Sequence, residues 1–131
     1  MDEDYLVKAT IGEIPYKTEV EYNGKIFISD EPESKGGQNF GPTPSQLLAS
    51  SLATCAAITL RMYVNRKQWQ VEEISVVVSF RQENNITKFI VKIEVEGNLE
   101  DTARERLLQI AKLCPIHKIL TNTIEIDTQL S

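Results

Sequence analysis

The feature that most constrains this chain is a run without any charged residue, from Gly36 to Leu60. The apolar second half of this run covers about 14 residues, whereas a helix that spans a membrane needs roughly 20. Ahead of it, Thr43 can cap a helix, Pro44 fits the first helical position, and Gln46 can bond back to the cap. We therefore predict a long helix that starts at Thr43, runs to about residue 66 and is buried on most sides.

Short runs of alternating apolar and polar residues predict strands on both sides of this helix. Two of the runs are joined by Asn23-Gly24, and Asn-Gly favours a type I′ hairpin because both central residues need a positive φ. An apolar stripe that ends at Cys114 predicts a second helix from Asn98, and Pro115 can start a short third helix through Leu120. The predicted strands cover residues 6–11, 15–22, 25–29, 71–80, 89–96 and 123–128. This order predicts one α+β domain over residues 1–131, with mainly antiparallel sheet.

A helix that is buried on most sides is hard to cover with 131 residues alone. We therefore expect a second copy of the chain to cover it, in an intertwined homodimer. The net charge of −5 argues against nucleic acid as a partner, because non-specific binding to nucleic acid needs a basic face. An acidic N-terminus without the pattern of a signal peptide predicts a cytoplasmic protein, and we expect no membrane partner.

The chain has two cysteines, Cys55 in the middle of the predicted long helix and Cys114 directly before Pro115. In one interpretation both are small apolar residues of the core, since free cysteine is among the most buried residue types. In the other they carry chemistry, because unpaired amide groups and the helix dipole at a helix start favour a thiolate. Their wide separation in the sequence leaves open whether they meet.

The only histidine, His117, follows Cys114 by three positions, so both can lie on one side of a helical turn. It can hold a proton or support a thiolate, or it can have no role. A metal site formed by these two residues and Cys55 has weak support, because structural zinc takes four ligands. We predict neither a metal nor a cofactor.

Two segments carry a family resemblance: SDEPESKGGQNFGPTPSQLLASSLATCAAITLRMYVNRKQW at Ser29–Trp69 and LLQIAKLCPIHKIL at Leu107–Leu120. They contain an Asp-Glu-Pro loop, a Gly-Gly turn, a Gly-Pro-x-Pro helix start, a Cys in an uncharged helix and a later Cys-Pro. In this order and spacing the chain resembles the OsmC/Ohr family of osmotically inducible and organic hydroperoxide resistance proteins, across almost its whole length. The resemblance implies an OsmC-like fold, in which antiparallel sheets wrap around a long central helix, and an intertwined homodimer with its active sites at the subunit interface.

The resemblance also implies a chemistry that protects cells under oxidative or osmotic stress. The characterised enzymes of the family reduce peroxides and prefer organic hydroperoxides. Cys55 matches the cysteine that attacks the peroxide as a thiolate and becomes a sulfenic acid, and Cys114 matches the cysteine that then forms a disulfide with it. A small dithiol, lipoyl-type in some members, regenerates the pair.

The sequence departs from the peroxidases of this family in two places. They hold the thiolate with an arginine from the N-terminal hairpin region, whereas the first arginine here is Arg61, which the helical repeat turns away from Cys55. A lysine of that region, such as Lys17, is the available substitute. They also carry a glutamate near the start of the central helix, where this chain has Ser45 and Gln46. The alternative function is therefore a non-catalytic homodimer of this fold that binds an apolar or thiol-bearing small molecule.

Overall fold

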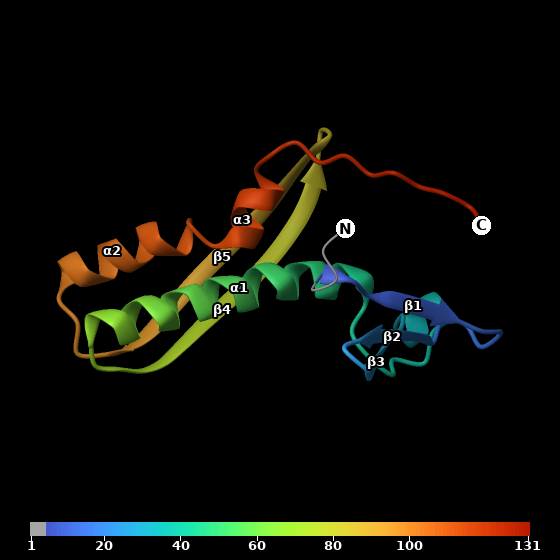
Figure 1. Ribbon diagram of the computed structural model, residues 1–131, viewed down its shortest axis with the longest axis horizontal. Coiled ribbons are helices and arrows are strands. Elements are labelled where there is room, and N and C mark those ends of the chain that lie inside the picture. Colours follow the sequence, from blue (N-terminus) through green and yellow to red (C-terminus); the bar gives the residue numbers. More distant parts are fainter. Residues whose placement is uncertain (1–4) are drawn as a thin grey trace. The chain divides into compact units, whose positions relative to one another are not determined.

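The computed structural model describes residues 5–131, and its elements are labelled in Figure 1. The chain forms two compact units, residues 1–48 and 49–131. The boundary falls within the long helix α1 (Pro44–Lys67), so this helix starts in the first unit and continues in the second. Each unit has a sheet of its own.

The N-terminal unit contains a three-stranded antiparallel sheet. Its strands β1 (Lys8–Ile11), β2 (Thr18–Tyr22) and β3 (Lys25–Ser29) are neighbours in that order. Asn23 and Gly24 connect β2 to β3 with φ values of 49° and 76°. Both values are positive, as a type I′ turn requires. The predicted hairpin is therefore confirmed, and β1 and β2 are shorter than the sequence indicated.

The loop after β3 is organised around one buried carboxylate. The side chain of Asp30 is 2% exposed and accepts hydrogen bonds from the backbone N–H groups of Tyr16, Glu31, Gln38 and Phe40. Burial raises the pKa of a carboxyl group, but these hydrogen bonds outweigh it and hold the pKa of Asp30 below its usual value. A short 3₁₀ helix, η2 (Glu33–Lys35), lies within the loop.

The start of α1 has the predicted capping box. The N–H of Thr43 donates to Oε1 of Gln46 at 2.9 Å, and the N–H of Gln46 donates to Oγ1 of Thr43 at 3.1 Å. At the other end, Gln68 takes a left-handed φ of 59° and the N–H of Trp69 donates to the carbonyl of Val64. These two local arrangements fix both ends of the helix, close to the predicted bounds.

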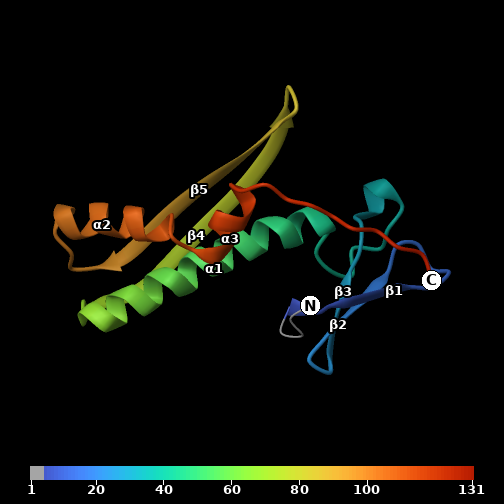
Figure 2. The same cartoon turned by 45° about the horizontal axis from the view of Figure 1, so that its top comes forward.

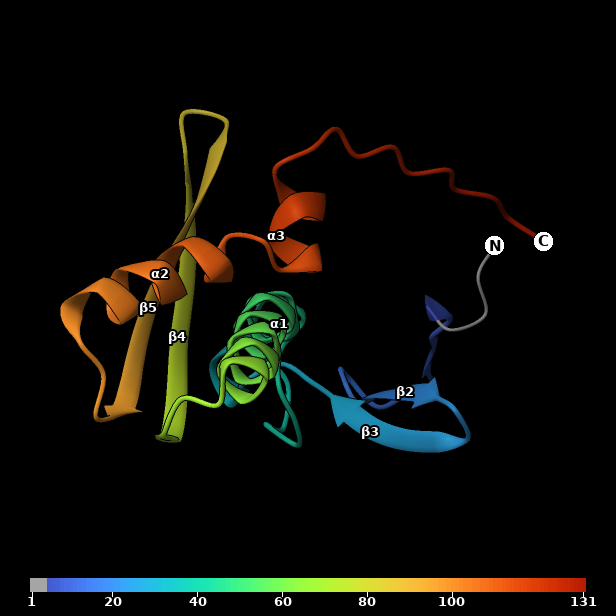
Figure 3. The same cartoon turned by 60° about the vertical axis from the view of Figure 1, so that its left-hand side comes forward.

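The C-terminal unit packs α1 against a long hairpin and two shorter helices. β4 (Val71–Glu83) and β5 (Ile86–Gly97) pair antiparallel, and Asn84-Asn85 forms the tight turn between them. α2 (Asp101–Ala111) starts three residues later than predicted, and α3 (Pro115–Leu120) has the predicted bounds. Figures 2 and 3 show the hairpin and α2 beside α1.

The core of this unit lies between the second half of α1 and α2, whose buried residues belong to the predicted apolar stripe. Its buried residues are Leu60, Tyr63, Val64, Leu107, Ile110 and Ala111. Partly buried side chains of the hairpin and of the adjoining loops pack against it: Trp69, Val71, Ile74, Ile93, Val95 and Leu99.

Within residues 5–131, only one face of α1 is buried, and the hairpin and α2 cover it. Ile58 and Met62, on another face, are 55% and 67% exposed. This agrees with the expectation that one chain alone cannot cover the helix, and burial of the remaining faces by a second copy stays a prediction. By length and by its mean hydropathy, 1.5 over the most apolar stretch, α1 is also a candidate membrane span, but core helices of soluble proteins pass the same test.

The strand predicted at residues 123–128 does not form in the described chain. The segment from 124 to the C-terminus is extended but has no ladder partner, and Ile124 and Ile126 are 55% and 84% exposed. The alternating apolar and polar residues of this segment fit a strand. A strand also needs a neighbouring strand for its backbone hydrogen bonds, and residues 5–131 supply none.

Candidate thiol site

The structure brings the two cysteines together in the C-terminal unit. Cys55 lies half-buried on α1, Cys114 is 0% exposed, and Cys55 is close enough to raise the pKa of the Cys114 thiol. Both cysteines are free. Two neighbouring free thiols can form a disulfide where their Cα atoms lie within about 7 Å of each other.

The position of Cys114 follows from the proline after it. Pro115 occupies the first position of α3, so Cys114 stays outside the helix, with extended φ and ψ of −63° and 139°. Its sulfur then accepts a hydrogen bond from the backbone N–H of His117 at 3.3 Å, as the side chain of an N-cap residue does. The Cys114 N–H donates to the carbonyl of Ala111, which ties the residue to the end of α2.

The electrostatics of Cys114 correct one expectation from the sequence. Burial raises the pKa of the Cys114 thiol, and the neighbouring Cys55 raises it further. The hydrogen bond from the N–H of His117 acts in the opposite direction but does not outweigh them, so the pKa stays above its ordinary value. The start of α3 therefore does not make Cys114 a thiolate at neutral pH.

His117 supports Cys114 through its backbone. The hydrogen bond to the sulfur comes from the main-chain N–H, and the imidazole is half-buried. The sequence predicted that unpaired amide groups at this helix start act on the sulfur, but it gave His117 a role only through its ring. The signal that could have revealed it is the cysteine directly before a helix-starting proline, because the N-cap side chain accepts from the N–H three residues later. No group of three His, Cys, Asp or Glu side chains within residues 5–131 is arranged to hold a metal ion.

The other predicted site residues have contacts of their own. Gln46 completes the capping box with Thr43, and Ser45 is exposed in the first turn of α1. Lys17 belongs to the N-terminal unit, where its ammonium group lies 5.9 Å from the centre of the Phe40 ring. The contacts of Gln46 and Lys17 give these two side chains a structural role that does not involve a thiol.

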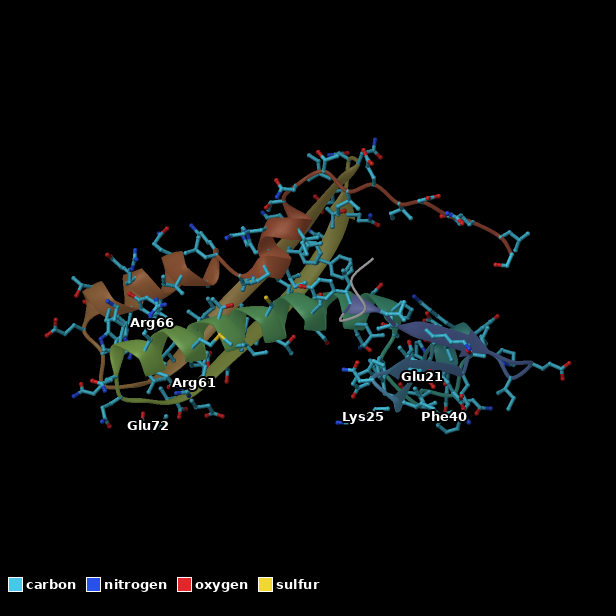
Figure 4. All side chains as sticks on the ribbon, viewed as in Figure 1. Glu21, Lys25, Phe40, Arg61, Arg66 and Glu72 are labelled. Atoms are coloured by element: carbon cyan, nitrogen blue, oxygen red, sulfur yellow. The ribbon has the colours of Figure 1, made fainter. Side chains whose placement is uncertain are left out.

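Arg61 points away from the cysteines, as the sequence predicted. Its guanidinium group donates to the carbonyl oxygens of Val71 at 3.0 Å and Glu72 at 3.3 Å, at the start of β4. Figure 4 labels Arg61 and Glu72 in this region. The arginine therefore fixes the connection between α1 and β4.

An apolar groove runs along the exposed face of α1 and begins two residues after Cys55. It has a volume of about 460 Å³ and is lined by Ala57, Ile58, Arg61, Met62 and Ile74. A groove of this size and composition suits an apolar group of a small molecule.

A family model described as OsmC-like protein matches residues 35–129, and this match includes both cysteines. The chain belongs to the OsmC-like protein family. Comparison of this OsmC-like chain with curated proteins gives no significant match.

Solved structures of OsmC-like and Ohr proteins share the fold of this OsmC-like chain. The OsmC-like protein of Mycoplasma pneumoniae has a TM-score of 0.76 at 20% identity, with 92% of this chain and 89% of that chain covered. The organic hydroperoxide resistance protein OsmC of Legionella pneumophila has a TM-score of 0.62 at 24% identity, with 88% of each chain covered. The organic hydroperoxide resistance protein OhrB of Bacillus subtilis has a TM-score of 0.60 at 22% identity, with 88% of this chain and 89% of that chain covered. These similarities confirm the predicted α+β fold class.

Proposed function

We propose that this OsmC-like protein is a thiol-dependent peroxidase that reduces organic hydroperoxides, with Cys55 and Cys114 as its catalytic residues. The observation that carries the proposal is the proximity of two free thiols of unequal exposure, close enough for Cys55 to raise the pKa of Cys114. Family membership and neighbours named as organic hydroperoxide resistance proteins support the substrate class. The free thiols also fit a reducing compartment such as the cytoplasm.

The two roles follow from the unequal exposure of the cysteines. A peroxide reaches the half-buried Cys55 but has no access to Cys114, which is fully covered. Cys114 is in addition held as a neutral thiol, because its pKa is raised, and the thiolate is the nucleophile in this chemistry. Cys55 is therefore the residue that attacks the peroxide, and Cys114 is the one that resolves the product.

The proposed reaction forms the disulfide in two steps, and a reductant then restores the two thiols. The Cys55 thiolate attacks a peroxide oxygen of ROOH: an S–O bond forms, the O–O bond breaks, and the alkoxide takes the proton of Cys114 and leaves as ROH. The Cys114 thiolate formed in this way attacks the sulfur of the Cys55 sulfenic acid, an S–S bond forms and hydroxide leaves. A small dithiol of the lipoyl type then reduces the disulfide by thiol–disulfide exchange.

The proposal is tested by treating the reduced protein with one equivalent of cumene hydroperoxide and mapping both cysteines by mass spectrometry. We expect a Cys55–Cys114 disulfide in the natural chain and a trapped sulfenic acid on Cys55 in Cys114→Ser. Cys55→Ser should consume no hydroperoxide, and Cys114 in that variant should remain a thiol. Oxidation of Cys114 in Cys55→Ser at the rate of the natural chain would reverse the assigned roles.

We propose in addition that the working form is a homodimer. The exposed apolar side chains of α1, Ile58 and Met62, and the unpaired C-terminal segment with Ile124 and Ile126 support this proposal. A second copy can cover the helix and supply a strand for the segment to pair with. Light scattering after size exclusion should give twice the chain mass at micromolar concentration, and a mass of 14.8 kDa would contradict the proposal.

A second candidate function is a non-catalytic OsmC-fold protein that binds an apolar or thiol-bearing small molecule. It is favoured by the engagement of Arg61 with β4, because no arginine precedes it in the sequence to hold a thiolate at Cys55. The apolar groove beside Ile58 and Met62 is its natural binding site. Multiple turnovers of hydroperoxide with a dithiol, lost in Cys55→Ser, would eliminate this candidate.

A further inference from the structure

Three basic side chains gather around one aromatic ring at the end of α1, away from the thiols. The cationic groups of Arg66, Lys67 and Arg106 lie 5.5, 5.8 and 6.0 Å from the centre of the Tyr63 ring. Arg106, from α2, also donates its Nε–H to the hydroxyl of Tyr63 at 3.2 Å. Figure 4 labels Arg66 at the end of α1 near α2. The chain as a whole is acidic, with a net charge of −5, so this concentration of cations is local.

None of these three cations forms a salt bridge with a carboxylate in the described part of the chain. The salt bridge found within residues 5–131 joins Arg81 and Glu83, on the β4–β5 hairpin. Like charges that gather around one ring repel one another, and the π face of Tyr63 offsets part of that repulsion. An anion bound beside the cations would reduce it further.

A cavity of about 420 Å³ lies directly beside this cluster. Trp69, Leu99 and Ala103 give it apolar walls, while Lys67 and Arg106 supply two positive charges and Glu100 one negative charge. Its volume is in the range of small-molecule sites. The lining therefore carries one net positive charge together with an apolar surface.

We propose that this cavity binds a small monocarboxylate with an apolar body. The single net charge of the lining matches a single carboxylate, and the planar guanidinium group of Arg106 suits the two oxygens of that group. The apolar body lies against Trp69 and Leu99. Tyr63 is eight residues after Cys55 on α1, a rise of about 12 Å along the helix, so this site is distinct from the thiol pair.

The chain contains its own reporter for this site, because Trp69 is its only tryptophan. Cyclohexanecarboxylate does not absorb where tryptophan is excited, so it can be titrated against Trp69 emission, with cyclohexanecarboxamide as the neutral match of the same shape. We expect a saturable change with the acid and at least about tenfold weaker binding of the amide. Raising the salt concentration should weaken binding of the acid only.

Four variants complete the experiment. Lys67→Gln and Arg106→Gln should each weaken binding of the acid several-fold, and Lys67→Gln leaves the Arg106–Tyr63 hydrogen bond in place, which controls for folding. Glu100→Gln removes the carboxylate from the lining and should tighten binding. Lys88→Gln, on the hairpin, removes the same charge elsewhere and should change nothing.

The result that would overturn the proposal is equal binding of acid and amide, the absence of saturation up to roughly 50 mM, or equal weakening by Lys88→Gln and Lys67→Gln. The proposal does not depend on the peroxidase reaction. A Cys55→Ser protein that has lost all turnover should bind the acid as the natural chain does.

Discussion

Asp30 and Cys114 are both almost fully buried acids, one in each unit, yet their pKa values move in opposite directions. Four backbone N–H groups point at the carboxylate of Asp30, and together they outweigh the cost of burial. Cys114 is influenced by the backbone N–H groups of His117 and Ile116 and has another acid, Cys55, beside it. The balance between backbone donors and burial thus decides the direction in which the pKa of a buried acid moves.

The largest effect expected from this difference concerns thiol reactivity. In Cys55→Ser, the remaining Cys114 should react with iodoacetamide at pH 7 at least about tenfold more slowly than Cys55 does in Cys114→Ser, because Cys114 is covered and protonated. Mass spectrometry of timed samples measures both rates. Equal rates would mean that burial neither covers Cys114 nor keeps it protonated, and the comparison would fail.

The next effect concerns the stability of the N-terminal unit. Asp30→Asn replaces one acceptor oxygen by an NH₂ group, which faces backbone N–H groups and leaves them without an acceptor. The melting temperature should fall by on the order of 10 °C. Glu105→Gln, on the exposed side of α2, is the matched control and should change it little. A similar small change for Asp30→Asn would show that the four hydrogen bonds do not hold the loop.

The free energy of unfolding should depend on pH in two ranges, an acid range set by Asp30 and an alkaline range set by Cys114. The pKa of Asp30 is lower in the folded protein than its unfolded value of about 3.9. The contribution of Asp30 to the free energy of unfolding is therefore present above about pH 4 and is lost as the pH falls through the folded pKa. The pKa of Cys114 is higher in the folded protein than its unfolded value of about 8.5. Its contribution is therefore present below about pH 8.5 and is lost as the pH rises.

Urea unfolding of the reduced protein from pH 2 to 10 measures both ranges. Asp30→Asn should weaken the pH dependence of the free energy of unfolding at acid pH and keep it at alkaline pH, whereas Cys114→Ala should do the reverse. A variant that weakens the pH dependence in both ranges, or in the opposite one, would contradict the assignment.

The smallest effect expected is that of Cys114→Ala on stability at pH 7. This change removes one sulfur acceptor from the N–H of His117, and a hydrogen bond of this kind contributes about 1 kcal/mol. Urea unfolding of the reduced protein measures the difference, with Cys55→Ala as the half-buried comparison. A loss of more than about 3 kcal/mol would show that Cys114 matters mainly to packing.

The sequence predicts the arrangements in which the interacting residues are close neighbours in the chain. The turn at Asn23-Gly24, the capping box of Thr43 and Gln46, and the start of α3 at Pro115 are all confirmed, because each depends on two to four residues. The direction of Arg61 follows in the same way from the repeat of the helix.

The sequence fails where the partner is remote or belongs to the backbone. Asp30 gathers its donors from as far as Tyr16 in one direction and Phe40 in the other, and no side-chain pattern marks them. The proximity of Cys55 and Cys114 depends on how α1 packs near α3, which local spacing does not encode, so the family resemblance predicted it and the spacing did not. The C-terminal strand is the opposite case, since its pattern is clear but a pairing partner is missing from the described chain.

The hydrogen bond from His117 to the sulfur of Cys114 ties two properties of the chain to a single atom. That atom both caps the start of α3 and forms the bond in the proposed reaction, so position 114 is restricted twice. Serine, threonine, asparagine and aspartate would cap the start of the helix equally well, but none of them has a sulfur to oxidise. Methionine has a sulfur, but it has no thiol with which to form a disulfide. Of the twenty amino acids, cysteine alone meets both demands.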